Sequence, residues 1–188
     1  MATVLDIRGT HGSGKSWVVH TLLGKYDHAE IIEEGKLIGY HLQKVDVAVV
    51  GKYTTACGGC DQVGSADEVV RRVRLFCESY KFVVLEGILV SHTFSRYNQL
   101  AADLEGGGHR YRFFFLNTPL KVCIARVQSR RDRSGNTKPL DPKNIIKDHA
   151  SVWGRVQSAM REAGRDVTVL DYRVPMPTIL GAILCPHR

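Results

Sequence analysis

Apolar residues along this chain follow two patterns that alternate from one end to the other. Short continuous apolar runs are typical of buried parallel strands, whereas apolar residues three and four positions apart predict amphipathic helices. The runs predict strands at 3–8, 82–85, 111–116 and 167–170. The helical spacing predicts helices at 16–24, 66–80, 94–104, 119–130 and 141–163. Strands that alternate with helices indicate an α/β fold with a mostly parallel sheet.

The segment from 29 to 50 breaks this alternation. Its β-prone runs are short, and Gly35 and Lys44 interrupt them. Such spacing predicts an antiparallel hairpin or ribbon that leads into one more sheet strand near 45–50. We therefore expect a three-layer domain in which helices flank a mostly parallel sheet of about five strands, with the ribbon at 29–50.

Length and composition favour one domain that spans residues 1–188. A chain of 188 residues, 44% of them hydrophobic, can bury one large core but not two typical ones. No apolar run reaches the length of a membrane span and the N-terminus lacks a secretory layout, so we expect a cytoplasmic protein. The five cysteines are odd in number, which fits reduced thiols.

Positive charge is concentrated in one part of the chain. The net charge is +7 and the pI about 9.3. Residues 110–165 hold 13 lysines and arginines against four acidic residues, an excess of nine, so the rest of the chain is slightly acidic. This distribution favours a polyanionic partner such as DNA. The alternative is a solvated basic face that keeps the protein dissolved.

The strongest local signal is a glycine-rich stretch between the first predicted strand and the first predicted helix. It reads GTHGSGKS and matches the pattern GxxxxGK[ST] of a phosphate-binding loop. In such a loop, backbone N–H groups surround the phosphates, the lysine reaches the β- and γ-phosphates, and the final hydroxyl ligates Mg²⁺. The following helix adds its positive dipole end. We predict binding of ATP and Mg²⁺ by Gly9, Thr10, His11, Gly12, Ser13, Gly14, Lys15 and Ser16.

Open parallel sheets bind ligands beyond the carboxyl ends of their strands, so the residues after each strand are candidates for the site. Glu86 follows the apolar run 82–85, where a carboxylate would organise Mg²⁺. The alternative is a carboxylate that makes structural hydrogen bonds. Arg173 follows the last strand, where we expect a contact with the adenine.

The segment 51–61 follows the strand near 45–50 and is rich in small residues. Two adjacent glycines would let a substrate approach the backbone closely, and an aspartate could accept a proton from an attacking hydroxyl. The alternative is an ordinary surface loop. We predict substrate contacts from Lys52, Tyr53, Gly58, Gly59 and Asp61, with Asp61 as the preferred general base and Glu86 as its rival.

Four arginines surround the end of the predicted helix 119–130. Arg126 and Arg130 lie on one helical face, while Arg131 and Arg133 follow in the predicted loop. Phosphoryl transfer needs cationic groups next to the negatively charged oxygens of the transferring group, and it needs water to be excluded. We therefore predict a mobile, arginine-bearing lid near 130–141, with Arg133 toward the substrate. A solvated basic helix end is the alternative.

The remaining polar residues point to no further chemistry. Cys57 and Cys60 form one CxxC pair without a second pair, so zinc and redox roles are disfavoured. Asp6 and Arg8 alternate on a strand that should be buried, which favours a structural ion pair. The spacing of the remaining candidate histidines suggests no metal site; they are His20, His41, His92 and His149.

Together these motifs resemble the P-loop kinases of the nucleoside and nucleotide kinase type. The resemblance rests on the loop 9–16, the strand end 83–87 and the arginines of 126–133, and it covers most of the chain. It implies a parallel sheet flanked by helices and transfer of the ATP γ-phosphoryl group with Mg²⁺.

A narrower resemblance is to phage-encoded, thymidylate kinase-like proteins that include the 5-hydroxymethyluracil DNA kinases. It rests on 51–53, 57–61, 117–120, 126–131, 135–139 and 141–144. It implies phosphorylation of a base hydroxymethyl group within DNA. The chain lacks an Asp-Arg-Tyr-type motif after the strand 82–85, which argues against free thymidylate as the substrate.

Three functions follow from these observations. The first is a kinase of a modified pyrimidine in DNA, in which Tyr53, Phe94 or Tyr97 stacks on a flipped base. The second keeps the chemistry but phosphorylates a free nucleoside or nucleotide. The third is a nucleotide-dependent binding ATPase without an acceptor.

Overall fold

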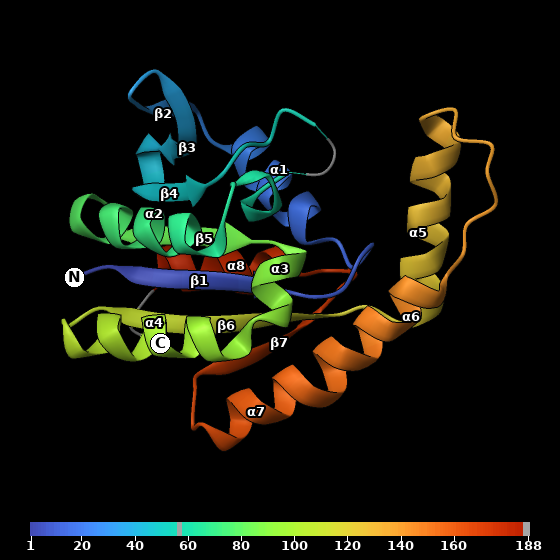
Figure 1. Ribbon diagram of the computed structural model, residues 1–188. Helices are drawn as coiled ribbons and strands as arrows, with labels where there is room; N and C mark the ends of the chain where they lie inside the picture. Colours follow the sequence, from blue (N-terminus) through green and yellow to red (C-terminus); the bar gives the residue numbers. More distant parts are fainter. Residues whose placement is uncertain (56–57, 186–188) are drawn as a thin grey trace.

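The computed structural model describes residues 1–55 and 58–185 and contains one mixed sheet (Figure 1). The strand order is β2-β3-β4-β5-β1-β6-β7. Five strands from β4 to β7 are parallel, while β3 pairs antiparallel with both β2 and β4. The predicted fold class is confirmed, ribbon included. The strands are β1 (Thr3–Arg8), β2 (His28–Glu33), β3 (Lys36–Leu42), β4 (Val47–Val50), β5 (Phe82–Glu86), β6 (Arg110–Asn117) and β7 (Val167–Asp171).

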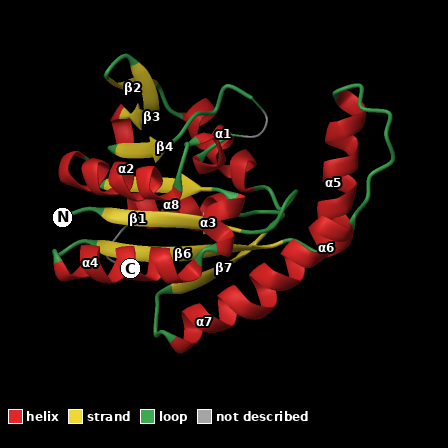
Figure 2. Ribbon diagram, viewed as in Figure 1, coloured by secondary structure: helices red, strands yellow, loops and turns green. Residues whose placement is uncertain are grey.

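Helices cover both faces of this sheet (Figure 2). Two of them were not predicted, because α3 is too short to show a helical period and α8 is apolar around most of its surface. None of the described helices is both long and apolar enough to cross a membrane. The helices are α1 (Lys15–Lys25), α2 (Ala66–Ser79), α3 (Ile88–His92), α4 (Phe94–Gly106), α5 (Leu120–Arg133), α6 (Lys143–Ala150), α7 (Gln157–Glu162) and α8 (Met176–Leu184).

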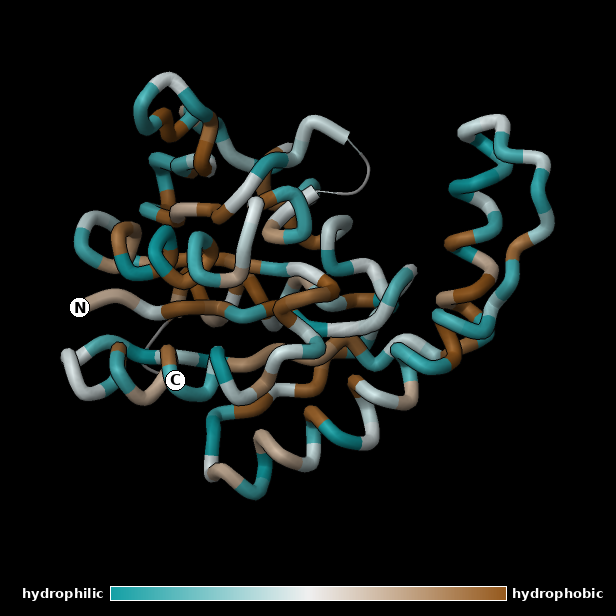
Figure 3. The backbone as a smooth tube through the Cα atoms, in the orientation of Figure 1, coloured by the Kyte–Doolittle hydropathy of each residue, from teal (hydrophilic) through white to brown (hydrophobic). Residues whose placement is uncertain are grey.

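Residues that alternate along the strands face two separate cores. Val4 and Val83 pack with α2, α4 and the turn before α7, whereas Leu5 and Val84 pack with α1 and α8. Figure 3 shows the resulting apolar stretches along the central strands. Burial on both faces explains why these strands are continuous apolar runs in the sequence.

The end of α5 corrects one prediction. Arg131 and Arg133 were expected in a loop, but α5 continues through both. The Gln128 side chain donates to Asp132 Oδ1 at 2.6 Å, and Arg133 Nε donates to the Ser129 carbonyl at 3.3 Å. These bonds between neighbouring turns extend the helix beyond its last apolar residue. The predicted helix 141–163 corresponds to α6, a π-helical segment at Ser151–Val156, and α7.

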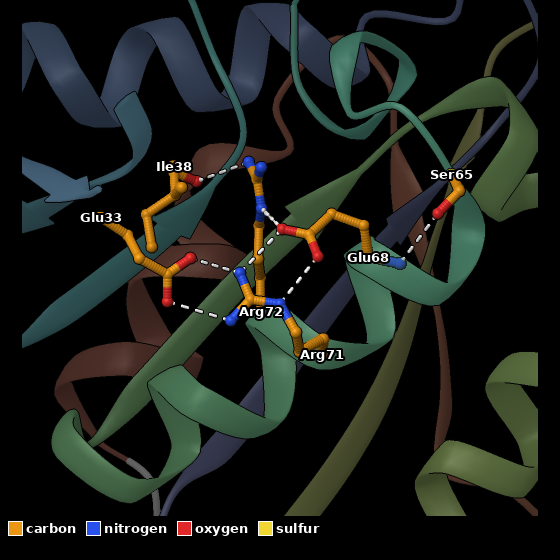
Figure 4. Close-up of polar contacts among 6 residues, drawn as sticks. All are labelled: Glu33, Ile38, Ser65, Glu68, Arg71 and Arg72. Carbon is orange, nitrogen blue, oxygen red and sulfur yellow. Dashed lines mark hydrogen bonds and ion pairs between the residues drawn. The ribbon is translucent and has the colours of Figure 1, made fainter. Parts of the chain in front are cut away.

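Ion pairs hold the β2–β3 ribbon against α2 (Figure 4). Arg71 of α2 pairs with Glu33 of β2 and, at 2.7 Å, with Glu68 of its own helix. Arg72 Nε donates to Glu68 Oε1 at 2.7 Å. The Ser65 hydroxyl caps α2 by accepting the Glu68 backbone N–H at 3.1 Å. The ribbon is therefore fixed to the body of the domain.

Residues 120–150, which comprise α5, α6 and their connection, form an arm beside the carboxyl ends of the parallel strands (Figure 1). Cys123, Val127 and Ile145 form a small apolar cluster that joins α5 to α6. The arm thus has its own minor core, separate from the two cores of the sheet.

Candidate active site

A cleft of about 1020 Å³ lies where the parallel strands end. The phosphate loop and Glu86 line it from the sheet, α3 lines it on one side, and the arginines of the arm line it on another. Ligand clefts of proteins span about 300–1,000 Å³, so this one is large enough for a nucleoside triphosphate and a second small group. Its position at the carboxyl ends of the strands is the one predicted.

The phosphate loop connects β1 to α1 in a tight curve. Gly12 has a φ of +73°, and a Cβ on it would lie 2.4 Å from the Cys123 carbonyl oxygen. Only glycine fits there, because the loop packs directly against the first turn of α5. Lys15 Nζ donates to the carbonyls of Gly9 and Thr10, at 2.9 and 3.2 Å. The lysine ammonium therefore lies inside the curve of the loop.

Glu86 is the buried carboxylate of the cleft. It ends β5 with 1% of its surface exposed, and Ser16 Oγ donates to its Oε1 at 2.9 Å. Burial raises the pKa of Glu86 to about 7, although the nearby Lys15 ammonium and the Ser16 hydrogen bond oppose the rise. A Cβ on Gly59 would lie 2.4 Å from Glu86 Oε1, so the 58–60 backbone packs directly over this carboxylate.

Asp61 lies in the cleft but also caps a helix. Its Oδ2 accepts the N–H of Ile88 at 2.9 Å, and its Oδ1 accepts the N–H of Leu89 at 3.1 Å. Both oxygens thus hold the first turn of α3 in place. The structure brings Asp61, Gly58 and Glu86 into the same cleft, as the sequence predicts.

Two of the three aromatic residues proposed to stack on a base, Tyr53 and Tyr97, are buried. Tyr53 is buried beside Glu86 and contacts the His20 ring edge to face. Tyr97 is 1% exposed and packs under the Arg8 guanidinium, and Phe94 packs against the core beside Phe113. The predictions for Tyr53 and Tyr97 are wrong because both rings are buried, whereas Phe94 is only partly buried and its stacking on a base stays a prediction.

One further residue of the 51–61 segment, Lys52, differs from the prediction. Lys52 forms an isolated antiparallel bridge with Gly59, and its side chain does not line the cleft. Cys57 lies outside the described residues. Cys60 is buried, and burial raises the pKa of its thiol well above the usual range, which disfavours the thiolate form.

The arginines have different positions. Arg126 Nη1 donates to the Ser13 carbonyl at 3.0 Å, and its guanidinium lies 5.5 Å from the centre of the Tyr172 ring. Arg130 and Arg133 line the cleft from the arm. Arg131 does not line it. Its Nη2 donates to the Lys138 carbonyl at 2.8 Å and so braces the connection between α5 and α6.

Arg173 follows β7 and lines the cleft together with Tyr172, the ring that the Arg126 guanidinium contacts. Its guanidinium pairs with Asp171 at 2.8 Å, and these hydrogen bonds lower the pKa of Asp171. This pair keeps Arg173 beside Tyr172, where we predicted a contact with the adenine.

The expected buried ion pair is present. Arg8 donates through Nε and Nη2 to Asp6 Oδ2, at 2.9 and 2.7 Å, and the Tyr111 hydroxyl donates to the same oxygen at 3.0 Å. All three groups are buried beneath the sheet face, away from the cleft. Their role is structural.

A polar cluster at the base of the arm was not predicted from the sequence. Asp148 of α6 lies 3.3 Å from His11 of the phosphate loop and 3.5 Å from His92 of α3. The neighbouring His149 Nε2 forms a hydrogen bond of 3.1 Å with the Thr118 carbonyl. No pattern in the sequence joins residues 11, 92 and 148, which only the packing of α6 brings together.

Two exposed apolar residues of the cleft, Trp17 and Leu89, were also missed. The available signal was local. Trp17 directly follows the phosphate loop, and Leu89 follows the acidic end of β5 by three residues. Trp17 lies in the predicted helix 16–24, and Leu89 lies between the predicted elements 82–85 and 94–104, so neither was a candidate for the site.

A parallel sheet with a phosphate loop after its first strand, an acidic strand end and a basic arm over one cleft defines a P-loop kinase. No protein-family model matches the chain. The chain is 34% identical over 148 residues to a 5-hmdU DNA kinase of Pseudomonas phage PaMx11, a match that covers 75% of this chain and 76% of that protein. The chain therefore belongs to the 5-hmdU DNA kinase family.

Proteins with the same description from two more phages are similar as well. The one from Delftia phage PhiW-14 is 29% identical over 169 residues, which cover 84% of this chain and 64% of that protein. The one from Pseudomonas phage M6 is 25% identical over 190 residues, which cover 95% and 96%. A solved deoxyadenosine kinase of M. mycoides with bound dATP aligns over 96% of this chain and 98% of its own, with 10% identity and a TM-score of 0.39.

Proposed function

We propose that this protein transfers the γ-phosphoryl group of ATP to the hydroxymethyl group of 5-hydroxymethyluracil within DNA. The observation that carries the proposal is the 34% identity with a 5-hmdU DNA kinase over three quarters of both chains. The cleft supports it, since the phosphate loop, a buried carboxylate and several arginines converge there.

The donor nucleotide would occupy the side of the cleft formed by the phosphate loop, α5 and the end of β7. Backbone N–H groups of the loop and the Lys15 ammonium would hold the phosphates. Arg126 contacts the loop and the Tyr172 ring, so it would place positive charge between phosphates and base. Tyr172 and Arg173 would then flank the adenine.

Ser16 and Glu86 are suited to hold Mg²⁺. Their oxygens form a hydrogen bond of 2.9 Å, and Mg²⁺ in nucleotide sites takes one or two protein oxygens besides phosphate and water. Among the described residues, no group of three or more histidine, cysteine, aspartate or glutamate side chains is placed to hold a metal ion. When bound, Mg²⁺ neutralises charge that develops on the transferring group.

We assign proton removal from the acceptor hydroxyl to Glu86 and not to Asp61. Burial raises the pKa of Glu86 to about 7, and a bound Mg²⁺ would lower it, so the carboxylate would be ionised and able to accept a proton at neutral pH. A carboxylate has two oxygens, so one can face the metal while the other accepts the proton. Both oxygens of Asp61 accept backbone N–H groups of α3, which makes Asp61 a positioning residue.

The direct test offers radioactive γ-phosphate ATP with four acceptors. These are DNA that contains 5-hydroxymethyluracil, the same DNA with thymine, the free nucleoside and its monophosphate. We expect label only in the modified DNA, and the rate should fall steeply with salt because the basic segment binds phosphates. Label confined to the small molecules would establish a nucleoside or nucleotide kinase. ATP hydrolysis without a labelled acceptor would establish an ATPase.

A further inference from the structure

The groups proposed to react lie at the floor of the cleft, out of reach of a stacked base. Glu86 is 1% and Lys15 is 7% exposed, and backbone of the 58–60 segment packs over Glu86. A base inside a duplex cannot bring its substituent to such a floor without leaving the stack. An enzyme that phosphorylates paired DNA at this floor therefore needs a group that extrudes the base.

Leu89 has the position and the surroundings of such a group. It lines the cleft on the side of Asp61 and is 60% exposed, although it is a large apolar residue. Solvent exposure of a leucine beside a buried polar floor brings no gain in folding. Its side chain is available to something that enters the cleft.

The backbone of Leu89 is held firmly. Asp61 accepts the N–H groups of Ile88 and Leu89, and Val90 is buried in the core. The Ser91 hydroxyl accepts the Gly9 N–H at 3.1 Å and so joins α3 to the start of the phosphate loop. A leucine that projects from a backbone fixed on both sides can push against a base pair without yielding.

Charge around the cleft fits a duplex. Arg130 and Arg133 line the same cleft from the arm, opposite the sheet and its phosphate loop. Arginines bind backbone phosphates and hold a duplex in register, while an apolar side chain such as leucine enters between base steps and unstacks them.

We propose that Leu89 is the wedge with which this protein opens duplex DNA, so that the substrate is paired DNA and the target base is turned out of the helix into the cleft. The inference rests on the proposed function. Trp17 is also exposed in the cleft, at 54%, but it belongs to the first turn of α1, directly after the phosphate loop.

The test compares Leu89→Ala with the wild-type enzyme on two acceptors of one sequence, a single strand and a fully paired duplex, each with one 5-hydroxymethyluracil. Leu184→Ala is the matched control, because Leu184 is a leucine of 58% exposure on α8, outside the cleft. We expect Leu89→Ala to lose about 10- to 100-fold in kcat/KM on the duplex and less than about 3-fold on the single strand. Leu184→Ala should match the wild type on both.

A second measurement needs no catalysis. With 2-aminopurine next to the modified base, wild-type enzyme should raise the fluorescence of the duplex on binding, and Leu89→Ala should not. Equal losses on duplex and single strand, or a duplex-specific loss in Trp17→Ala instead of Leu89→Ala, would overturn the wedge. Wild-type enzyme that labels single strands but not duplexes removes the wedge and leaves the proposed function standing. Wild-type enzyme that labels no DNA at all removes both.

Discussion

The sheet side and the arm side of the cleft are built in different ways. On the sheet side, Lys15 and Glu86 are buried and hydrogen-bonded to their neighbours, and Asp61 holds α3 with both oxygens. On the arm side, the polar connection after α5 is exposed, and the hydrogen bonds of Arg131 go to other residues of the arm. Rigid packing thus surrounds the groups proposed to react, while the arm presents positive charge from an element with little core of its own.

The arm meets the sheet side only near its base among the described contacts. Gly12 packs against Cys123, Arg126 donates to Ser13, and Asp148 lies beside His11. These three contacts involve the phosphate loop, and Asp148 also lies 3.5 Å from His92 of α3. A nucleotide bound at the loop would therefore touch the place where the arm is attached. Because the sheet side is rigid and the arm is attached only near its base, the arm is suited to close over a nucleotide that the sheet side holds.

The groups proposed to react lie on the sheet side of the cleft, and Glu86→Gln is the most severe test of this placement. The amide keeps the size of the side chain but cannot take up a proton, so kcat should fall by about 10²- to 10⁴-fold. Single-turnover labelling of modified DNA measures it. Asp61→Asn is the control, because it keeps one oxygen for the cap of α3 and should retain kcat within about 10-fold. The reverse ranking would make Asp61 the base.

Although Glu86→Gln should lower kcat, it should raise the free energy of unfolding at high pH. Burial raises the pKa of Glu86 to about 7, from 4.5 in the unfolded chain, so the folded protein binds the extra proton between these values. Stability from this group is complete below pH 4.5 and is lost as the pH rises through about 7. In chelator at pH 8, Glu86→Gln should unfold with a free energy higher by on the order of 2 kcal/mol, and the difference should vanish near pH 4.5. Urea titrations at both pH values check this, and a variant less stable than the wild type at pH 8 would contradict the burial of a charged Glu86.

On the arm side, two arginines of α5 can be compared by substitution. Arg126 contacts the phosphate loop, whereas Arg131 braces the connection to α6. Charged hydrogen bonds contribute about 1.5–3 kcal/mol, so Arg126→Ala should lower kcat/KM for ATP by about 10- to 100-fold. Arg131→Ala should change kcat/KM for ATP less than 5-fold, because exposed charged contacts contribute at most about 1 kcal/mol. Similar losses in both variants would mean that the arm acts as one rigid unit.

Sequence patterns were sufficient for the parts of the molecule that depend on neighbours along the chain. The apolar run before Glu86, the glycines of the phosphate loop and the alternation of strands and helices are local, and the structure has them where they were predicted. Tyr97 was misjudged because burial under Arg8 depends on how α4 packs on the sheet. Leu89 was missed because it lies between the predicted elements 82–85 and 94–104, and only the fold shows that it lines a cleft.

A smaller effect on ATP binding is expected at the base of the arm, where Asp148 meets the phosphate loop. Asp148→Ala removes the carboxylate that lies beside His11 and His92, and so loosens α6 from the phosphate loop. Partly exposed pairs contribute about 0.2–1 kcal/mol, which predicts a roughly 2- to 5-fold rise in KM for ATP with little change in kcat. Steady-state kinetics separate the two constants. A fall in kcat with an unchanged KM would instead indicate that Asp148 acts during transfer.

The smallest effect should come from the ribbon, which lies outside the cleft. Hydrogen bonds from Arg71 and Arg72 lower the pKa of Glu68 to about 2, so its stabilising contribution exists above pH 4.5 and is lost as the pH falls toward 2. Because Glu68 is partly exposed, solvent screens these pairs, and Glu68→Gln should lower the free energy of unfolding by at most about 1 kcal/mol at pH 7. Thermal unfolding at pH 7 and pH 3 measures the difference, which should shrink at the lower pH, while the rate of DNA labelling should stay at the wild-type level. A loss of labelling would show that the ribbon reaches the cleft through α2, and the division into a fixed sheet side and a separate arm would then be incomplete.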